Sequence, residues 1–269
     1  MKAMVFAAGL GTRLRPITDS LPKALVPVCG EPLLYHTLHK LKSAGYTDIV
    51  VNIHHFPQMI REYLQTHDFG LDVSISDESD RLLETGGGIL HARNLLLPLD
   101  EPFLVHNVDI VSNLDIAWFR AQMRPDALAT LLVSERKTQR YLLFNEEMRL
   151  VGWTNIGTGE VRSPYKDLDP ARCRKFAFAG IHNISPAIFQ AFEALNMPER
   201  FPIMDFYLDA CASYPIYGAA AQDLQLVDVG KLETLPEAER VCQSILFRTE
   251  GSVQDRSAEH PCLAGEIWQ

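Results

Sequence analysis

The segment KAMVFAAGLGTRLRP, residues 2–16, decides the fold that we expect for this chain. Its first half is a continuous apolar run, which is typical of a strand covered on both faces of a sheet. The run ends in a turn with Gly9 and Gly11, and Arg13 follows at once. Glycines let backbone N–H groups approach an anion closely, and a guanidinium matches phosphate oxygens. The segment therefore predicts a buried strand that leads into a phosphate-binding loop.

Positive charge gathers around this loop although the whole chain is acidic. The 269 residues carry 25 Lys and Arg against 34 Asp and Glu, a formal net charge of −9. Six of those cations, Lys23 among them, lie in residues 1–42 beside only two carboxylates. This distribution favours a small polyanion as the ligand of the loop. The acidic balance argues against general nucleic-acid binding, which needs a basic surface.

Outward from the loop, the first half alternates strand-like runs with apolar residues at helical spacing. We predict strands at residues 2–8, 48–53, 71–76 and 102–109, and helices at residues 32–44, 57–65 and 89–97. This alternation predicts an α/β fold with a doubly wound, mainly parallel mixed sheet. Ligands of such sheets bind beyond the carboxyl ends of the strands. The candidate segments are therefore residues 9–15, the segment around His54, residues 76–88, and Asp109.

The second half is less regular. We predict strands at residues 128–134, 141–144, 176–184 and 224–229, and helices at residues 186–194, 203–212 and 235–247. Ser185 is the expected cap of the helix that begins at residue 186. No linker rich in Gly, Pro or Ser interrupts the chain. We therefore expect one continuous domain over residues 1–250, with an elaborated second half, and an irregular tail over residues 251–269.

Two further patterns carry chemistry. Three glycines, Gly86–Gly88, come directly before the helix predicted from residue 89, so their N–H groups are expected to be free to face a flat base or a ribose. A plain flexible loop is an equally good interpretation of these glycines. Asp109 and Asp228 each follow or end a predicted strand, and Mg²⁺ commonly takes two carboxylates plus substrate phosphates. Each aspartate taken alone is also consistent with a solvated turn.

Several classes of protein are disfavoured by the sequence. The dinucleotide pattern G-x-G-x-x-G needs glycine where Leu14 stands, which argues against a nicotinamide oxidoreductase, and the P-loop pattern is absent. The five cysteines are scattered and form no C-x-x-C, so neither a disulfide framework nor a zinc site is expected. No apolar run approaches the ~20 residues of a membrane span, and the N-terminal run is too short for a signal peptide. We expect a cytoplasmic protein without a membrane partner.

The motifs resemble those of a known family. GLGTR at residues 9–13, with Pro-Lys at residues 22–23, is similar to the signature of sugar-1-phosphate nucleotidyltransferases, the NDP-sugar pyrophosphorylases. ETGGGI at residues 84–89 resembles the bacterial branches similar to N-acetylmuramate-1-phosphate uridylyltransferase and to mannose-1-phosphate guanylyltransferase. Segments that match later motifs of the family follow in order: NVD at residues 107–109, FAGIH at residues 178–182 and DVG at residues 228–230.

The resemblance implies a Rossmann-like nucleotidyltransferase fold and the reaction of a nucleoside triphosphate, UTP or GTP, with a sugar 1-phosphate to give an NDP-sugar and pyrophosphate. It implies a nucleotide-binding half over residues 1–125 and a sugar-phosphate-binding half over residues 126–250. The residues that it implicates fall into four groups: Gly9, Gly11, Thr12, Arg13 and Lys23 on the triphosphate; Gly86 and Gly87 beside the base; Asp109 and Asp228 on Mg²⁺; Gly180 and Asn155 near the sugar phosphate. Arg13, Lys23 and Asp109 would be the catalytic residues.

One alternative within the resemblance is a catalytically weak homologue that binds a nucleotide or an NDP-sugar as a sensor or regulatory subunit. Val108 motivates it, because the family usually has a small residue next to the metal-binding aspartate. The joint presence of Arg13, Lys23, Asp109 and Asp228 argues for the active enzyme. The sequence does not define the oligomeric state, and a homodimer is compatible with it.

Overall fold

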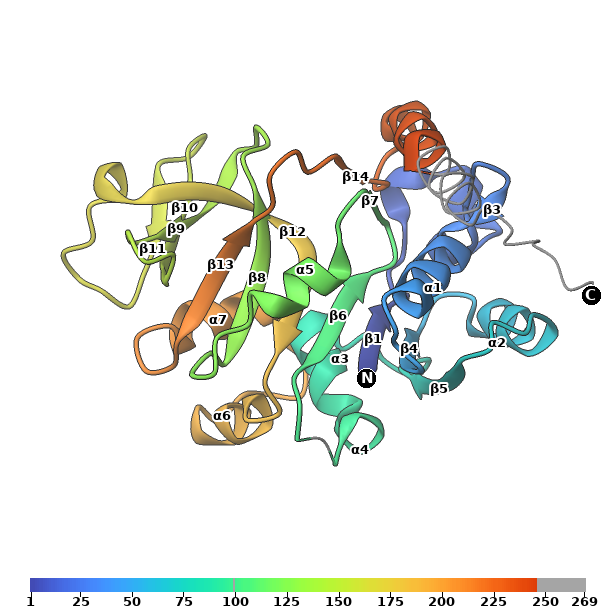
Figure 1. Cartoon of the computed structure of the whole chain (residues 1–269), viewed down its shortest axis with the longest axis horizontal. Helices are drawn as coiled ribbons and strands as arrows, with labels where there is room; N and C mark the ends of the chain where they lie inside the picture. Colours follow the sequence, from blue (N-terminus) through green and yellow to red (C-terminus); the bar gives the residue numbers. More distant parts are fainter. Residues whose placement is uncertain (99, 246–269) are drawn as a thin grey trace, which may run out of the picture.

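The computed structural model describes residues 1–98 and 100–245, and a ten-stranded sheet forms its centre (Figure 1). Neighbouring strands along the sheet are, in order, β5 (Asp72–Asp77), β4 (Asp48–Ile53), β1 (Lys2–Phe6), β6 (Phe103–Asn107), β12 (Arg174–Ile184), β9 (Arg140–Phe144), β10 (Leu150–Asn155) and β11 (Glu160–Arg162). Off this path, β8 (Ala129–Ser134) pairs with β12 and with β13 (Ile216–Ala220). The predicted α/β class with a mixed central sheet is confirmed.

The position of β1 explains why the loop after it matters. β1 pairs in parallel with β4 on one side and with β6 on the other, so that Val5 lies opposite both Val51 and His106. The chain passes from β1 to β4 and later returns to β6 on the opposite side of β1. Such a reversal opens a crevice beyond the carboxyl end of the strand, which is where α/β sheets bind ligands. The antiparallel pairs of this sheet involve strands of the second half, beginning with β12 against β6.

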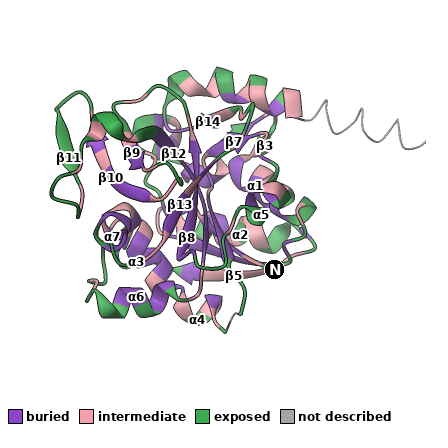
Figure 2. Ribbon diagram, turned by 60° about the vertical axis from the view of Figure 1, so that its left-hand side comes forward, coloured by how far each residue is buried: buried purple, intermediate pink, exposed green. Residues whose placement is uncertain are grey.

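Helices cover both faces of the sheet, and the alternation of side chains along β1 explains the two layers. Val5 of β1 belongs to one core cluster and Met4 to the other. The first cluster includes Leu34 and Leu38 of α1 (Leu33–Ser43), and the second includes Phe189 of α6 (Ile188–Ala194). These side chains are buried, and full burial of each contributes roughly 1.5–3 kcal/mol of hydrophobic stabilisation. Figure 2 shows that the strands at the centre of the sheet are mostly buried.

The other elements complete the two layers. Further α-helices are α2 (Pro57–Thr66), α3 (Glu84–His91), α4 (Arg93–Leu96), α5 (Ile116–Ala121) and α7 (Ile203–Ala210). Two short ribbons lie outside the main sheet: β2 (Pro27–Val28) with β3 (Glu31–Pro32), and β7 (Ile110–Ser112) with β14 (Leu226–Asp228). Single 3₁₀ turns are η1 (Thr12–Leu14), η2 (Ile17–Asp19), η3 (Lys23–Leu25), η4 (Pro170–Arg172) and η5 (Leu232–Thr234). A further helix covers residues 235–245.

The structure corrects the predicted helix at residues 89–97. The helix α3 begins at Glu84, so the three glycines lie inside it, and α4 follows as a separate short helix. The N–H groups of Gly86 and Gly87 donate to the carbonyl oxygen of Phe201 at 2.8 and 3.1 Å. A partner from a distant segment therefore satisfies the amides that local sequence would leave free at a helix start.

Smaller corrections concern the second half. Ala187, and not Ser185, is the cap residue of α6, although Ser185 Oγ still accepts a 3.3 Å hydrogen bond from the Ala187 N–H. The strands β10, β11 and β13 were not predicted, because their short runs lack clear alternation. The predicted helix at residues 235–247 is confirmed as far as residue 245. Its last two residues and the predicted tail at residues 251–269 lie outside the described residues.

Within the described part of the chain, no helix combines the length and the apolar character needed to cross a bilayer.

Candidate functional site

A cavity of about 340 Å³ lies beyond the carboxyl ends of β1 and β6. Gly9, Lys23 and Asp109 border it, and all three were predicted from the sequence. Asn52 and Thr85 also border it and were not predicted as site residues. The volume is within the range of pockets that hold one small organic ligand. The fold therefore brings the glycine-rich loop and a carboxylate to one cavity.

The glycine-rich loop is folded into a tight turn. Gly11 has a φ of +64°, and a Cβ added there would lie 2.8 Å from Thr18 Cγ2, so a side chain is excluded both by backbone conformation and by space. Its carbonyl oxygen accepts a 2.8 Å hydrogen bond from the Leu14 N–H and another from Thr18 Oγ1 at 2.8 Å. Gly9, by contrast, is exposed, and nothing lies within 4 Å of an added Cβ. Thr12 is exposed as well.

Lys23 and Asp109 form an ion pair at the edge of the cavity. Lys23 Nζ donates to Asp109 Oδ2, and the two side chains are only 10% and 19% exposed. Lys23 begins the turn η3, and Asp109 follows β6 closely, after Val108. A nearly buried ammonium and a carboxylate next to a cavity can hold an anion and a cation side by side.

Asp228 joins this pair through the ribbon of β7 and β14. Asp228, the last residue of β14, lies opposite Ile110, and the Val229 N–H donates to the Asp109 carbonyl oxygen at 2.8 Å. Asp228 Oδ1 is buried and accepts no hydrogen bond from the described residues. The two predicted metal-binding carboxylates are thus neighbours, although more than a hundred residues separate them in the chain.

The electrostatics of Asp228 reflect this crowding. Burial, and after it the charge of Asp109, raises the pKa of the Asp228 carboxyl, while Lys23, Arg13 and Arg136 act in the opposite direction. A buried oxygen without a donor beside a second carboxylate suits a bound cation, and oxygen ligands suit Mg²⁺. No group of three or more His, Cys, Asp or Glu residues in the described ranges is arranged to hold a metal ion. Two carboxylates together with ligand oxygens would still meet the needs of Mg²⁺.

Arg13 reaches the same place from the glycine-rich loop. A Cβ added at Gly230 would lie 2.8 Å from the Arg13 Nη2 atom and 2.8 Å from Asp228 Oδ1. The glycine at position 230 therefore leaves the space in which the guanidinium approaches the Asp228 carboxylate. The structure thus brings together Gly9, Arg13, Lys23, Asp109 and Asp228.

Gly180 of β12 lies next to the segment that carries Asp109. It has a φ of +76°, and a Cβ added there would lie 3.0 Å from Asn107 Nδ2 and 3.0 Å from Ile110 Cγ1. The close approach of β12 to the segment that carries Asp109 thus depends on a residue without a side chain.

Three predicted site residues lie away from this cluster. Gly86 and Gly87 do not border the cavity, because the segment at residues 199–201 packs against them. Asn155 ends β10, and its Oδ1 accepts a 3.0 Å hydrogen bond from the Gly157 N–H in the turn before β11. The expectation that free glycine amides face a base is therefore wrong, because Phe201 uses those amides. Roles for Gly86, Gly87 and Asn155 in ligand binding remain predictions.

Sequence reasoning missed Arg136. Its guanidinium donates to the Phe178 carbonyl oxygen at 3.1 Å, two residues before Gly180. It shares a second cavity, of about 730 Å³, with Arg174, Ser134 and Leu226, and Leu226 lies on the same strand as Asp228. Ser134 Oγ is buried and has no hydrogen-bond partner among the described residues. The cations at residues 136, 137 and 140 were a visible signal, but nothing in their spacing connects them to Asp228.

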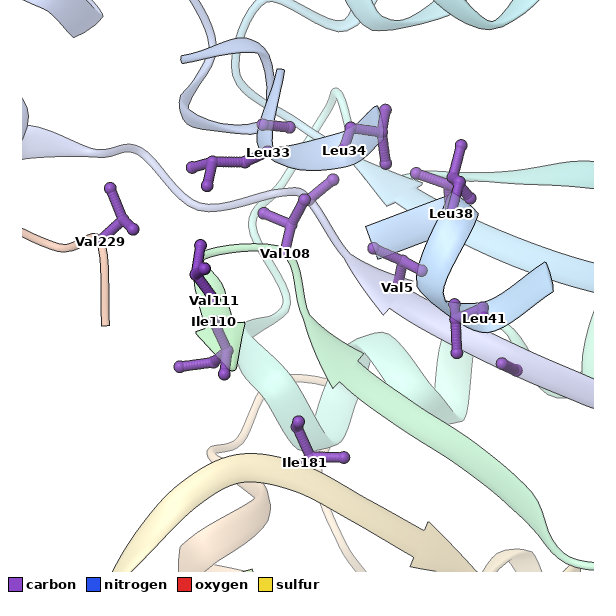
Figure 3. Packing of buried hydrophobic residues seen from close by; sticks show 14 of the residues in the cluster. Val5, Leu33, Leu34, Leu38, Leu41, Val108, Ile110, Val111, Ile181 and Val229 are labelled. Atoms are coloured by element: carbon purple, nitrogen blue, oxygen red, sulfur yellow. The ribbon is translucent and has the colours of Figure 1, made fainter. Parts of the chain in front are cut away.

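Val108 is part of the core. It is 4% exposed, and its side chain lies beside Leu33 and Leu34 of α1 (Figure 3). Its N–H donates to the Phe6 carbonyl oxygen at 3.1 Å. The residue also borders the cavity, but its branched side chain is accommodated under α1. The reason for suspecting a binding-only homologue therefore loses its force.

The chain is similar in sequence to known proteins. A family model described as nucleotidyl transferase matches residues 2–142. An N-acetylmuramate alpha-1-phosphate uridylyltransferase of Caulobacter vibrioides is 46% identical over 112 residues, which are 40% of this chain and 46% of that protein. A mannose-1-phosphate guanyltransferase of Hypocrea jecorina is 36% identical over 113 residues, 41% of this chain and 31% of that protein. The matched segments thus span half or less of these curated relatives.

The fold also has solved counterparts. The structure of an inositol-1-phosphate CTP transferase from T. maritima superposes with a TM-score of 0.72, covering 91% of this chain and 95% of the other at 16% identity. At that identity the likeness concerns the fold, and it extends over both halves of the chain.

Proposed function

This chain belongs to the nucleotidyl transferase family, and we propose that it transfers a nucleotidyl group from a nucleoside triphosphate to a sugar 1-phosphate. In the proposed reaction, a phosphate oxygen of the sugar phosphate bonds to the α-phosphorus while the bond from that phosphorus to the bridging oxygen breaks. The products are an NDP-sugar and pyrophosphate. The observation that carries the proposal is the meeting of Lys23 and Asp109 at one cavity beside the glycine-rich loop, with Asp228 next to Asp109.

The chemistry asks little of the protein beyond position and charge. The attacking phosphate oxygen is ionised at neutral pH, so neither a general base nor a protein nucleophile is required. The two substrates repel each other, and the enzyme must hold attacker and leaving group in line. In our proposal Gly9, Gly11, Thr12 and Arg13 hold the triphosphate, and Lys23 offsets charge near the reacting phosphorus.

Asp109 and Asp228 would hold Mg²⁺. The orphaned Oδ1 of Asp228 and the adjacent carboxylate of Asp109 suit the oxygen preference of that ion. When bound, magnesium would offset negative charge on the phosphates. Lys23, which pairs with Asp109 in the structure, would keep that carboxylate oriented toward the cavity.

Arg136 is the residue that we propose for the sugar-phosphate side. Its guanidinium donates to the Phe178 carbonyl oxygen, and the residue borders the same cavity as Leu226. Its positive charge partly opposes the rise in the pKa of the Asp228 carboxyl that burial and Asp109 cause. A guanidinium in this place can bind the phosphate of the acceptor sugar in bidentate fashion. The absence of a side chain at Gly180 would leave space for the sugar, and Asn155 would lie at the outer edge of the region that binds the sugar phosphate.

The relatives suggest which substrates to test first. The Caulobacter relative is named for uridylyl transfer to N-acetylmuramate α-1-phosphate, and the Hypocrea relative for guanylyl transfer to mannose 1-phosphate. We propose UTP as the donor, because the uridylyltransferase has the higher identity, with GTP second. We further propose a cytoplasmic enzyme whose partners are its two substrates, and a homodimer stays an expectation.

The test is a pyrophosphate-release assay with Mg²⁺. UTP, GTP, CTP, ATP and dTTP are each combined with N-acetylmuramate 1-phosphate, mannose 1-phosphate and glucose 1-phosphate. Release with at least one pair, together with formation of the matching NDP-sugar by mass spectrometry, is the expected result. Binding of a triphosphate without release from any pair would favour the sensor. Binding of NAD without any triphosphate would favour the oxidoreductase.

A further inference from the structure

Two buried polar side chains at the back of the cavity, Asn52 and Glu78, carry an inference about nucleotide binding. Each is 3% exposed, and both border the cavity next to Gly9 and Lys23. Neither belongs to a recognised motif of the sequence. Buried polar groups are costly unless they are hydrogen-bonded, so the partners of these two residues indicate their purpose.

Asn52 holds the start of the glycine-rich loop. It lies in β4 opposite Phe6, the last residue of β1. Its Oδ1 accepts from the N–H of Ala7 at 2.8 Å and from the N–H of Ala8 at 3.3 Å. These two amides come just after the strand and just before Gly9. A single amide oxygen therefore fixes the direction in which the chain leaves β1.

Glu78 holds the start of α3 and is joined to Asn52. Its Oε1 accepts from Asn52 Nδ2 at 2.8 Å, and its Oε2 accepts from the Leu83 N–H at 3.1 Å. Leu83 directly precedes α3, whose residues Glu84 and Thr85 border the cavity. Gly88 makes room for the pair, because an added Cβ would lie 2.9 Å from Glu78 Oε1.

We propose that Asn52 and Glu78 are positioning residues that set the distance between the glycine-rich loop and α3, and thereby the affinity of the site for the nucleotide. The inference rests on the proposed function, since it assumes that the cavity holds a nucleoside triphosphate. The loop and α3 border the same cavity, and the chain Ala7–Asn52–Glu78–Leu83 is a continuous line of hydrogen bonds between them. A ligand that contacts both walls binds best when their separation is already correct.

The order of donors and acceptors along these hydrogen bonds can be tested by substitution. Each hydrogen bond has a fixed donor and a fixed acceptor, so a change at one residue creates a mismatch. Asn52→Asp places two carboxylates against each other. Glu78→Gln gives the side chain an NH₂ group that faces another N–H donor. The double variant Asn52→Asp/Glu78→Gln restores every bond. Its new carboxylate accepts from the Ala7 N–H and from the new side-chain amide, and the oxygen of that amide accepts from the Leu83 N–H. The buried negative charge is retained and only moves.

The experiment measures the dissociation constant of UTP with Mg²⁺ by titration calorimetry, without an acceptor sugar, and the melting temperature of each variant. If UTP does not bind to the wild-type chain, the same titration is made with GTP. We expect each single variant to weaken binding by about 10-fold or more and the double variant to return within about 3-fold of the wild type. Asn183→Asp is the matched control. It makes the same change at a buried asparagine, 2% exposed, that bonds to the Phe119 carbonyl outside the cavity, and it should lower the melting temperature without changing the affinity.

Two results would overturn the proposal. One is unchanged affinity in both single variants. The other is a double variant that regains its melting temperature while its affinity stays as low as in the weaker single variant. A wild-type chain that binds a triphosphate but releases no pyrophosphate would count against the proposed function only. The affinities of the single and double variants would still decide whether Asn52 and Glu78 position the nucleotide site. A wild-type chain that binds neither UTP nor GTP would refute both the proposed function and the positioning role of Asn52 and Glu78.

Discussion

At the scale of single residues, the site depends on charges that the fold forces together. Asp109 and Asp228 are neighbours, and Lys23 pairs with only one of them. The second carboxylate keeps a buried oxygen without a partner among the described residues, and its pKa is raised. Such an arrangement costs stability in the absence of a cation, and binding of a cation would relieve that cost.

The first prediction concerns Asp109. Replacing it by Ala removes one proposed oxygen ligand and the partner of Lys23, so kcat should fall by about 100-fold or more, comparable to the loss of a preorganised electrostatic group. Steady-state pyrophosphate release at saturating Mg²⁺ measures the effect, and circular dichroism checks that the variant is folded. Normal turnover of a folded Asp109→Ala variant would refute the metal assignment.

The second prediction concerns Arg136. Because a guanidinium in the second cavity would bind the acceptor phosphate, Arg136→Ala should raise the KM for the sugar 1-phosphate by about 10-fold or more and leave the KM for the triphosphate unchanged. Lys137→Ala is the control, since Lys137 is exposed and borders neither cavity. Equal effects of the two variants on both KM values would show that only the general positive charge matters.

At the scale of elements, α3 shows how a distant segment overrides a local preference. Three consecutive glycines disfavour a helix by about 1 kcal/mol each relative to alanine. The helix forms because the segment at residues 199–203 packs against it: Phe201 accepts from two glycine amides, and Thr85 Oγ1 accepts from the Ile203 N–H at 2.9 Å. The glycines are needed for space, since a Cβ at Gly86 would collide with the ring of Phe201.

The third prediction follows from this contact. Gly86→Ala gains about 1 kcal/mol of helix propensity but forces Phe201, which is 4% exposed and packed on Phe192, to move. Overpacking of this kind costs roughly 1–3 kcal/mol or more, so the free energy of unfolding should fall. Urea denaturation measures it. Adding Phe201→Leu should recover part of the loss, and a Gly86→Ala variant more stable than the wild type would contradict the packing argument.

At the scale of the whole molecule, a buried pair links the central sheet to its helical cover. His182 of β12 is 1% exposed, and its Nδ1 lies 2.7 Å from the hydroxyl of the fully buried Tyr207 of α7. Burial lowers the pKa of His182 to about 3. The unfolded chain therefore binds a proton at this histidine below about pH 6.5 that the folded chain does not bind, and stability falls as the pH drops from about 6.5 toward about 3.

The fourth prediction compares the wild type with His182→Gln. Between about pH 7 and about pH 5 the wild type should lose about 2 kcal/mol more of its free energy of unfolding than the variant, which has no histidine to protonate here. Urea denaturation at both pH values gives the difference. An identical loss in the two proteins would show that His182 is not kept neutral by the fold.

The sequence by itself determined the elements whose signal is local. The apolar run of β1, the leucine spacing of α1 and the apolar run of β4 predict those elements within two residues, because hydrophobic periodicity reports which face of a strand or helix is buried. The tight turn after β1, with Gly11 in the left-handed region, was also predictable, since the glycines that shape it stand close together in the chain.

Only the tertiary structure decided the rest. The meeting of Asp109 with Asp228, the start of α3 at Glu84, the bonding of Asn52 to Glu78 and the approach of Arg136 all join distant segments. No local pattern encodes such contacts, because each depends on which strands become neighbours and on what packs above them. The residue types carried the chemistry of the candidate site, and the pairing of the strands placed those residues within reach of one another.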